Sequence, residues 1–251
     1  MLRIGKVIES VDDWFEVAPP KKGLKHWVDG RSAKELAKAW FPSSGSPQLP
    51  PEFDALLQSR PETQGIEAER GEPERVTRFD GFRGEGRNAD LVLWGHGPNV
   101  GKVLVSVEAK ADEAFGEVAG EYANDTIAKK PRSNVPDRLE LLCQGIFGTS
   151  RNATLDALRY QLFTGVAGAL AEGSTDGYRA DAVLFVVHEF TSVVDPVKQK
   201  QNADDLDAFV DALPGGQTPK VTPGQLVGPF SVPGNQHFAG TDALFIGKCQ
   251  R

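Results

Sequence analysis

Residues 180–190 constrain the fold more than any other segment. Their sequence, ADAVLFVVHEF, is apolar over almost its whole length, which is typical of a strand buried on both faces of a sheet. The segment before it, residues 154–173, carries an apolar stripe at helical spacing and ends at Gly173. A strand that is buried on both faces needs a covering layer on each side. We therefore expect an α/β protein.

Three more strands are expected earlier in the chain, at residues 74–79, 89–94 and 102–110. The segment GHGPNVG between the second and the third contains three glycines and a proline, which predicts a hairpin loop. A helix at residues 32–41, opened by a capping box of Ser32 and Glu35, precedes these strands. The order predicts a mixed central sheet flanked by helices, with an αβββαβ core and C-terminal additions.

The length of 251 residues indicates one domain that spans residues 1–251. Residues 1–30 are expected to form an irregular lead-in and residues 31–190 the core. Residues 191–251 are expected to form an extension packed on the core. This extension is expected to contain a short helix and two strands, at residues 205–213, 226–232 and 242–248.

The composition is that of an ordinary soluble protein, with 39% apolar and 25% charged residues. The chain has no run of 18 apolar residues, and its start lacks the apolar core of a signal peptide, so we expect a cytoplasmic location. Cys143 and Cys249 form no CxxC pair and are interpreted as buried thiols. The net charge of −7 argues against binding nucleic acid by overall charge, so such a partner needs local basic patches.

The strand at residues 102–110 ends on two opposite charges. Because side chains alternate along a strand, Glu108 and Lys110 share one face. The pattern E-x-K is weak alone, since a chain of this composition contains about one by chance. Folding the hairpin about Pro98 puts Asp90 opposite residue 106, and hence diagonal to Glu108 on the same face. Both carboxylates would then lie within reach of one shared ion.

Two neighbouring carboxylates repel each other and raise each other's pKa unless a cation joins them. A hard ion such as Mg²⁺, with Mn²⁺ as a substitute, suits oxygen ligands and keeps water molecules that a phosphate can replace. Lys110 beside that ion is placed to orient a water molecule or to stabilise charge on a phosphate in the transition state. We therefore expect a metal-dependent site made of Asp90, Glu108 and Lys110.

This pattern resembles the PD-(D/E)XK nuclease superfamily: an aspartate, then E-x-K at the end of the next strand of a hairpin, then a helix and a buried strand. The resemblance covers roughly residues 30–190, and the string VEAKADEAFGE is similar to a poorly characterised bacterial family of that superfamily. It implies a restriction-endonuclease-like core, Mg²⁺-dependent hydrolysis of DNA, Asp90 and Glu108 as metal ligands and Lys110 as the catalytic lysine. One departure is Ala89, which stands where the superfamily often has a proline.

Some members of the superfamily add a glutamate on the first helix and a glutamine on the helix after the E-x-K strand. Glu35 and Gln161 stand at those positions, so the resemblance implies a further metal ligand in Glu35 and a site role for Gln161. Each has an alternative, because Glu35 fits a capping box and Gln161 fits a polar helix boundary. Gly165 and Gly168, on the side of Gln161, would let that helix approach the sheet closely.

Three other polar residues are expected to have ordinary roles. Glu113 and Glu117 are interpreted as residues of a solvated loop, with participation in the site or a second ion as the alternative. His188 lies within the buried strand and is interpreted as a core histidine with a backbone hydrogen bond.

Two basic segments are candidates for DNA contacts, with solvated loops as the alternative. RVTRFDGFRGEGR interleaves arginines with Phe79 and Phe82, which suits phosphate contacts and base stacking. The second segment is KKPRSNVPDR. A homodimer would let two sites cut both strands of a duplex. The basic residues of the two segments are Arg75, Arg78, Arg83, Arg87, Lys129, Lys130, Arg132 and Arg138.

The leading hypothesis is a Mg²⁺-dependent (endo)deoxyribonuclease in which Asp90, Glu108, Lys110 and Gln161 form the catalytic set. The first alternative is a nuclease-fold protein that binds nucleic acid or a protein partner without cutting, which the acidic balance favours. The second alternative is an unrelated α/β protein in which E-x-K forms a surface ion pair. Both nuclease-fold hypotheses require the two carboxylates to lie on the same face of the sheet.

Overall fold

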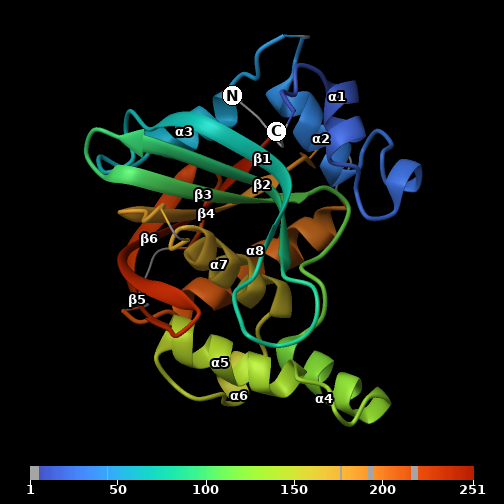
Figure 1. Ribbon diagram of the computed structural model, residues 1–251, viewed down its shortest axis with the longest axis vertical. Helices are drawn as coiled ribbons and strands as arrows, with labels where there is room; N and C mark the ends of the chain where they lie inside the picture. Colours follow the sequence, from blue (N-terminus) through green and yellow to red (C-terminus); the bar gives the residue numbers. More distant parts are fainter. Residues whose placement is uncertain (1–5, 44, 176, 192–194, 216–219) are drawn as a thin grey trace.

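The computed structural model describes residues 6–43, 45–175, 177–191, 195–215 and 220–251 (Figure 1). Within this part of the chain, a mixed sheet with the strand order β1-β2-β3-β4-β6-β5 lies between helices that cover both of its faces. The expected fold class is confirmed. The strands are β1 (Glu67–Thr77), β2 (Arg87–Gly97), β3 (Gly101–Lys110), β4 (Ala182–Glu189), β5 (Gln225–Asn235) and β6 (Phe238–Gln250).

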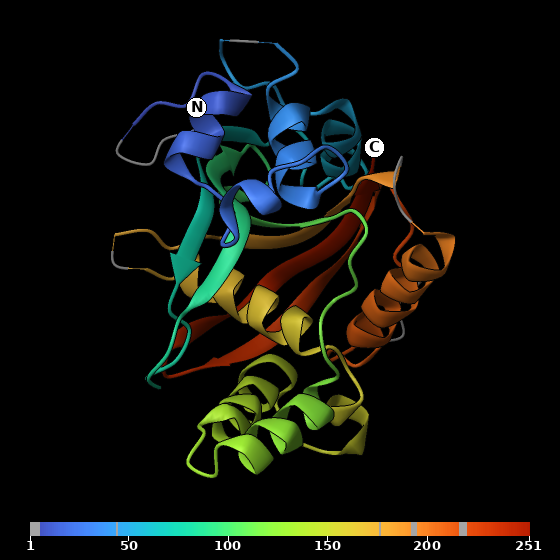
Figure 2. The same ribbon diagram turned by 90° about the vertical axis from the view of Figure 1, so that its right-hand side faces the viewer.

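The helices fall into an N-terminal group and a second group that mostly connects β3 to β4. The N-terminal group lies on one face of the sheet and α7 crosses the other (Figure 2). The first group is α1 (Val11–Val17), η1 (Gly23–Lys25), α2 (Ser32–Trp40) and α3 (Pro51–Gln58). The second is α4 (Ala119–Lys129), α5 (Val135–Phe147), α6 (Ala153–Asp156), α7 (Tyr160–Glu172) and α8 (Pro196–Asp211).

Parallel pairs form the centre of the sheet and antiparallel pairs form both of its sides. β1, β2 and β3 form an antiparallel meander, β3 is parallel to β4, and β4 is parallel to β6. β5 closes the far edge as an antiparallel partner of β6. A parallel pair needs a crossover connection, and the segment that contains α4 to α7 supplies it between β3 and β4. The start of α7 is thereby brought to the end of β3.

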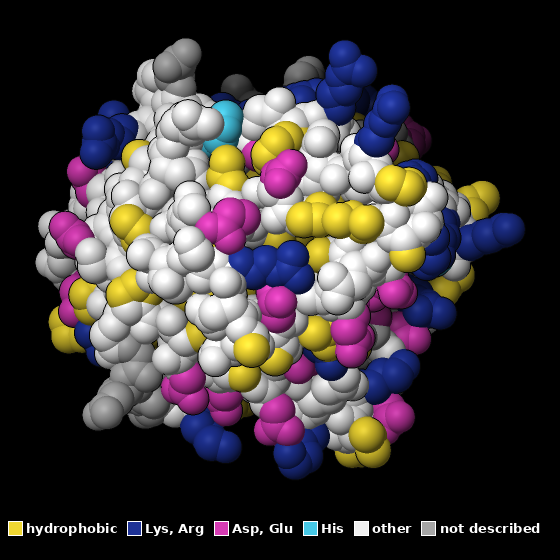
Figure 3. Space-filling model, turned by 90° about the horizontal axis from the view of Figure 1, so that it is seen from below, with side chains coloured by type: hydrophobic (Ala, Val, Ile, Leu, Met, Phe, Trp, Pro, Cys, Tyr) yellow, Lys and Arg dark blue, Asp and Glu magenta, His cyan; other side chains and the backbone are white. Residues whose placement is uncertain are grey.

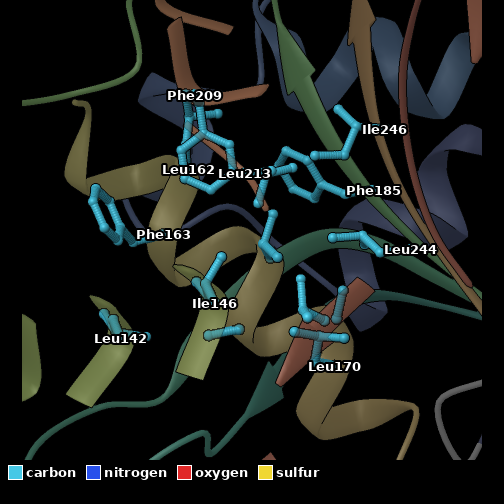
Figure 4. Packing of buried hydrophobic residues seen from close by; sticks show 14 of the residues in the cluster. Leu142, Ile146, Leu162, Phe163, Leu170, Phe185, Phe209, Leu213, Leu244 and Ile246 are labelled. Carbon is cyan, nitrogen blue, oxygen red and sulfur yellow. The ribbon is translucent and has the colours of Figure 1, made fainter. Parts of the chain in front are cut away.

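β4 is buried on both faces, as its apolar sequence predicts. Phe185 and Val187 belong to the apolar cluster under α5, α7 and α8, whereas Leu184 and Val186 belong to the cluster under α1 to α3. The side chains between α5, α7, α8 and the strands β4 and β6 interdigitate closely (Figure 4). Two apolar layers therefore hold the middle of the sheet from opposite sides.

The small residues of α7 allow the close approach that their spacing predicts. A Cβ atom added at Gly165 would lie 2.7 Å from Cε2 of Phe185, and one added at Gly168 would lie 2.8 Å from Cγ of Arg87. Both distances are shorter than real carbon contacts. Glycine at these two positions therefore sets the separation between α7 and the sheet.

We expect Gly165→Ala to lower the free energy of unfolding by about 1 to 3 kcal/mol, because the new methyl group overpacks the contact with Phe185. Urea unfolding followed by circular dichroism measures this change. The double variant Gly165→Ala/Phe185→Leu should recover part of the loss, since leucine removes the ring atoms that clash. An unchanged urea midpoint for Gly165→Ala would contradict the close packing of α7.

Several expected boundaries are wrong. The helix expected at residues 154–173 is two helices, because Asn152 caps the short α6 and Arg159 is extended and bridged to Val118. Arg31 rather than Ser32 is the N-cap of α2, and Ser32 donates to Glu113. The carboxylate of Glu35 does reach back, as in a capping box, but to the N–H of Gly30 at 2.9 Å.

Both ends of the chain are more regular than expected. The lead-in contains α1, whose Trp14 is buried. In the middle of the chain, α5 also has no counterpart among the expected elements. Residues 191–251 are not an extension packed on the core, because β6 lies inside the sheet between β4 and β5. The late strands could not be placed in the sheet from their own sequence, since pairing is decided by distant partners.

Three expected core residues are buried. Cys143 and Cys249 are free, buried thiols, and burial raises the pKa of both. His188 is buried, but its Nε2 lies 3.0 Å from a carboxylate oxygen of Glu52, so the expected backbone hydrogen bond is wrong. No helix among the described residues is long and apolar enough to cross a membrane.

Candidate active site

The β2–β3 hairpin brings Asp90 to Glu108. Gly97 pairs with Gly101, whose φ of 73° suits glycine, so the turn centres on Asn99 and the register differs by two residues from the expected one. The recorded ladder ends at Leu91 and Val107, and the next position of the same register sets Asp90 opposite Glu108. The correction brings the two residues closer together, from diagonal to opposite positions.

Where the backbone pairing of β2 with β3 ends, the side chain of Asp90 accepts a hydrogen bond from the backbone of β3. Its Oδ2 accepts the backbone N–H of Ala109 at 2.7 Å. Because Ala109 stands between Glu108 and Lys110, this bond fixes the Asp90 carboxylate beside both of them. The neighbouring Leu91 packs in the apolar layer under α1 to α3, so alternation along β2 places Asp90 on the other face, the α7 side that Glu108 also occupies.

Glu108 is the centre of a buried polar cluster under the start of α7. The Nζ of Lys110 lies 2.9 Å from Oε1 of Glu108, and Gln161 donates its amide N–H to the same oxygen at 2.6 Å. Lys110 donates to the amide oxygen of Gln161 at 2.9 Å. The three side chains therefore form a closed triangle that joins β3 to α7, and Gln161 has a place in the cluster rather than at a free helix boundary.

The burial of this cluster bears on the alternative in which E-x-K forms a surface ion pair. Glu108 and Lys110 are each only 3% exposed, so they do not emerge into solvent at the end of the strand. The hypothesis that they form a surface ion pair is therefore wrong. Burying an ion pair costs more desolvation than a surface pair requires, so this pair is weak evidence for a gain in stability.

Arg87 completes the charge balance of the cluster. Its guanidinium forms an ion pair with Oε2 of Glu108, the carboxylate oxygen that Lys110 and Gln161 leave free. The aliphatic part of Arg87 lies against Gly168 of α7, and its side chain is 13% exposed. Sequence analysis assigned Arg87 to DNA contacts, but in the structure its partner is a carboxylate of the site.

Burial shifts the ionisation of two residues in opposite directions. Burial raises the pKa of the Asp90 carboxyl, against the lowering effects of Arg87, of the Ala109 N–H and of Lys110. Burial lowers the pKa of the Lys110 ammonium to about 8, although the charges of Glu113 and Asp90 oppose this shift. The Lys110 ammonium therefore loses its proton at a lower pH than an exposed lysine does.

The structure adds Glu74, which sequence analysis took only as the start of a strand. Its neighbours Pro73 and Arg75 pair with Leu91 and Ala89, so Glu74 stands opposite Asp90 across β1 and β2. Its φ of 51° is unusual for a residue other than glycine. Burial and the charge of Asp90 raise the pKa of the Glu74 carboxyl to about 7.

No sequence signal marks Glu74, because neither its positive φ nor its position against Asp90 follows from local pattern. It accepts a hydrogen bond from the side-chain amide of Asn88. Within the described part of the chain, no three His, Cys, Asp or Glu side chains converge in a way that could hold a metal ion. Glu74 is therefore a neighbour of the carboxylate pair and not a third ligand in this arrangement.

Glu35 is not brought to the cluster. Its carboxylate accepts from Gly30 and pairs with Lys38 at 3.0 Å, and none of its recorded contacts reaches Asp90 or Glu108. Glu113 is half-buried, accepts from Ser32 and acts electrostatically on Lys110, so it is closer to the site than a solvated loop residue. Glu117 is exposed, as expected.

The basic segments are only partly free to meet a ligand. Arg75 pairs with Glu172 at 2.9 Å, and Phe79 is buried, so Phe79 cannot stack on a base. Lys and Arg side chains on the face in Figure 3 are interspersed with Asp and Glu and form no continuous basic stripe. Arg138 pairs with Asp80 at 2.6 Å. The exposed members are Arg78, Arg83, Lys129, Lys130 and Arg132.

The donor set of the cluster fits a hard divalent ion. Among the described residues, Asp90 accepts its one recorded hydrogen bond on Oδ2, so Oδ1 is left for another partner. Glu108 contributes a second carboxylate from the opposite position on β3. Mg²⁺ is commonly held by one or two carboxylates together with water and substrate phosphate, so two protein ligands are sufficient.

A shallow cavity of about 260 Å³ opens beside the cluster. Arg87, Gln161 and Tyr160 contribute to its lining, and Tyr122 lies against Tyr160 with ring centroids 4.7 Å apart. A second cavity, of about 410 Å³, lies on the opposite face of the sheet between α2, α3 and β1 to β3, and its lining is mainly apolar. The first cavity lies next to the cluster, because Arg87 and Gln161 in its lining both contact Glu108.

Fold and cluster together define an α/β protein with a buried carboxylate–lysine–glutamine site at the end of a parallel β3–β4 pair. A family model described as a domain of unknown function (DUF6946) matches residues 7–250, and the chain therefore belongs to this family. Searches of curated proteins and of solved structures found no match to the chain.

Proposed function

We propose that this protein is a divalent-metal-dependent nuclease that hydrolyses phosphodiester bonds of DNA in the cytoplasm. The observation that supports the proposal best is the position of Asp90, whose carboxylate bonds to the backbone between Glu108 and Lys110. Two carboxylates and a lysine are thereby gathered at one strand end, in the order that resembles the PD-(D/E)XK superfamily. Asp90 and Glu108 would hold the ion, with Mg²⁺ as the physiological metal and Mn²⁺ as a substitute.

Each residue of the cluster has a distinct part in the proposed reaction. Hydrolysis breaks one P–O bond, adds the hydroxyl of water to phosphorus and delivers the proton to the leaving oxygen. Lys110 would orient the attacking water and stabilise the charge that grows on the phosphate oxygens. Gln161 holds Lys110 and Glu108 in place, because it donates to one and accepts from the other. The bound ion would supply an attacking water of lowered pKa and neutralise phosphate charge.

DNA would reach the cluster from the side of the shallow cavity. The overall charge of −7 requires that phosphates be met by local cations. Four exposed basic residues are the proposed phosphate contacts: Arg78, Arg83, Lys129 and Lys130. Arg75 is not among them, because it forms an ion pair with Glu172. Such contacts position the strand and carry no sequence preference.

A second candidate function is supported by one observation. Arg87 and Lys110 already neutralise the charge of Glu108, so this carboxylate does not require a metal ion for charge balance. A protein of this kind would bind nucleic acid or a protein partner and leave it intact. The two candidates differ in whether added metal produces cleavage.

We expect the purified protein to cut at least one of single-stranded, duplex and branched DNA when Mg²⁺ or Mn²⁺ is present. A chelator should stop the reaction, and an excess of Mg²⁺ should restore it. Asp90→Asn should lose cleavage, because the amide cannot replace the charge of the carboxylate. Gel electrophoresis of end-labelled DNA measures the products.

The matched control is Asp181→Asn. Asp181 accepts the backbone N–H of Lys102 at 2.9 Å at the opposite end of β3, so the substitution makes a similar change away from the cluster. This variant should cut DNA as the wild type does. If all three DNAs stay intact with both metals and one of them is bound in a salt-sensitive manner, the second candidate function is correct.

A further inference from the structure

The guanidinium of Arg87 lies where a cation of the proposed site would be needed. It pairs with Oε2 of Glu108, and the charges of Asp90 and Glu74 act on it from β2 and β1. Arg87 stands three residues before Asp90 at the start of β2, so one strand supplies both a proposed ligand and a competing cation. The cluster therefore contains its own counter-ion in the absence of metal.

The side chain of Arg87 is packed against α7, but one of its buried nitrogens lacks a hydrogen-bond partner among the described residues. The aliphatic part of Arg87 rests against Gly168, where a Cβ atom would lie 2.8 Å from Cγ of Arg87. The Nε of Arg87 is buried and has no hydrogen-bond partner among the described residues. The unsatisfied buried donor offsets part of the stabilisation that the ion pair with Glu108 contributes, which favours the competing cation.

The Glu108 carboxylate cannot pair with Arg87 and coordinate a divalent ion through the same oxygen at the same time. Its Oε1 already accepts from Gln161 and lies against Lys110, so Oε2 is the oxygen that an ion would take. A guanidinium and a divalent ion at the same carboxylate oxygen repel each other strongly in a buried site. Binding of the ion thus requires Arg87 to move.

We propose that Arg87 is a positioning residue that holds Glu108 in the metal-free protein, competes with the divalent ion and is displaced when the ion binds. The shallow cavity beside the cluster, which Arg87 lines together with Gln161 and Thr164, has room for the displaced guanidinium. There it meets the phosphate of an entering DNA strand. Metal loading and phosphate binding are linked in this way, and the inference rests on the proposed metal-dependent function.

Titration calorimetry with Mn²⁺ alone tests the competition. Arg87→Met keeps the aliphatic contact with Gly168 and removes the charge. It should bind Mn²⁺ about tenfold more tightly than the wild type or better, because the ion no longer displaces a paired cation. Arg87→Lys, which keeps the charge without the planar fork, should fall between the two and serves if the methionine variant does not fold.

The control is Arg138→Met, since Arg138 forms an ion pair of similar exposure with Asp80 outside the cluster. This variant should bind Mn²⁺ as the wild type does. Thermal unfolding gives a second readout: Mn²⁺ should raise the Tm of Arg87→Met by more than that of the wild type. In cleavage assays at saturating metal, Arg87→Met should raise KM for DNA more than it changes kcat.

The outcomes separate this inference from the proposed function. If the wild type binds Mn²⁺ and Arg87→Met binds it with equal or lower affinity, Arg87 does not compete with the ion and the inference is wrong, while the nuclease proposal stands. If neither protein binds Mn²⁺ and Asp90→Asn behaves in the same way, the metal site itself is wrong and both proposals fall.

Discussion

Replacing Glu108 by glutamine is expected to lower the free energy of unfolding by about 3 to 5 kcal/mol in the presence of a chelator. The physical reason is that the substitution removes the one anion that Arg87 and Lys110 contact directly. Both cations would stay buried without a directly paired carboxylate, which costs far more than the loss of a surface ion pair. Guanidinium unfolding followed by circular dichroism measures the change.

A double variant separates the lost pairing from a general loss of packing. Glu108→Gln/Arg87→Met removes the anion and one of its two cations together, so it should recover part of the stability lost in Glu108→Gln. The interaction energy from the full cycle isolates the Arg87–Glu108 pair. A loss below about 1 kcal/mol for Glu108→Gln would mean that water reaches the cluster and that its charges are not truly buried.

The hairpin that carries the site could be predicted because its determinants are local. Alternation along β3 sets Glu108 and Lys110 on one face, and the glycines of GHGPNVG mark the turn. The register was wrong by two residues, since the turn centres on Asn99 and not on Pro98. A shift by an even number keeps the same face, so the pairing of the carboxylates survived the error.

The rest of the site depends on distant contacts that no local pattern contains. Arg87 belongs to a basic segment, and only the fold shows that its partner is Glu108 on the next strand. Glu74 adopts its positive φ against the preference of its residue type. Glu35 was inferred from position in the chain, and α2 turns its carboxylate to Gly30 instead.

The same distinction applies to the fold. Residues 180–190 predicted a strand covered on both faces because burial on two sides leaves a continuous apolar pattern. The break between α6 and α7 has no such pattern, because it comes from the bridge of Arg159 to Val118 and from the pair of Arg159 with Asp205 on α8. The place of β6 between β4 and β5 likewise depends on partners far away in the chain.

Lys110→Met is expected to lower the rate of DNA cleavage by about 10² to 10³-fold while the fold is retained. The Nζ of Lys110 lies over the ring of Phe115, 5.1 Å from its centroid. Methionine has a length and volume close to those of the lysine side chain, so it can fill this space. The ammonium that would stabilise charge on the phosphate is lost. Single-turnover cleavage at saturating Mg²⁺ measures the rate of the chemical step.

The metal affinity of Lys110→Met distinguishes its proposed role from a structural one. Removing a cation beside Asp90 and Glu108 should leave Mn²⁺ binding unchanged or stronger, so a fall in rate with retained binding places Lys110 in the chemical step. Lys248→Met is the matched control, because Lys248 is also 3% exposed and pairs with Glu189 at 3.7 Å on β4. Equal losses of cleavage in both variants would show that burial of a lysine, and not its place beside the carboxylates, explains the effect.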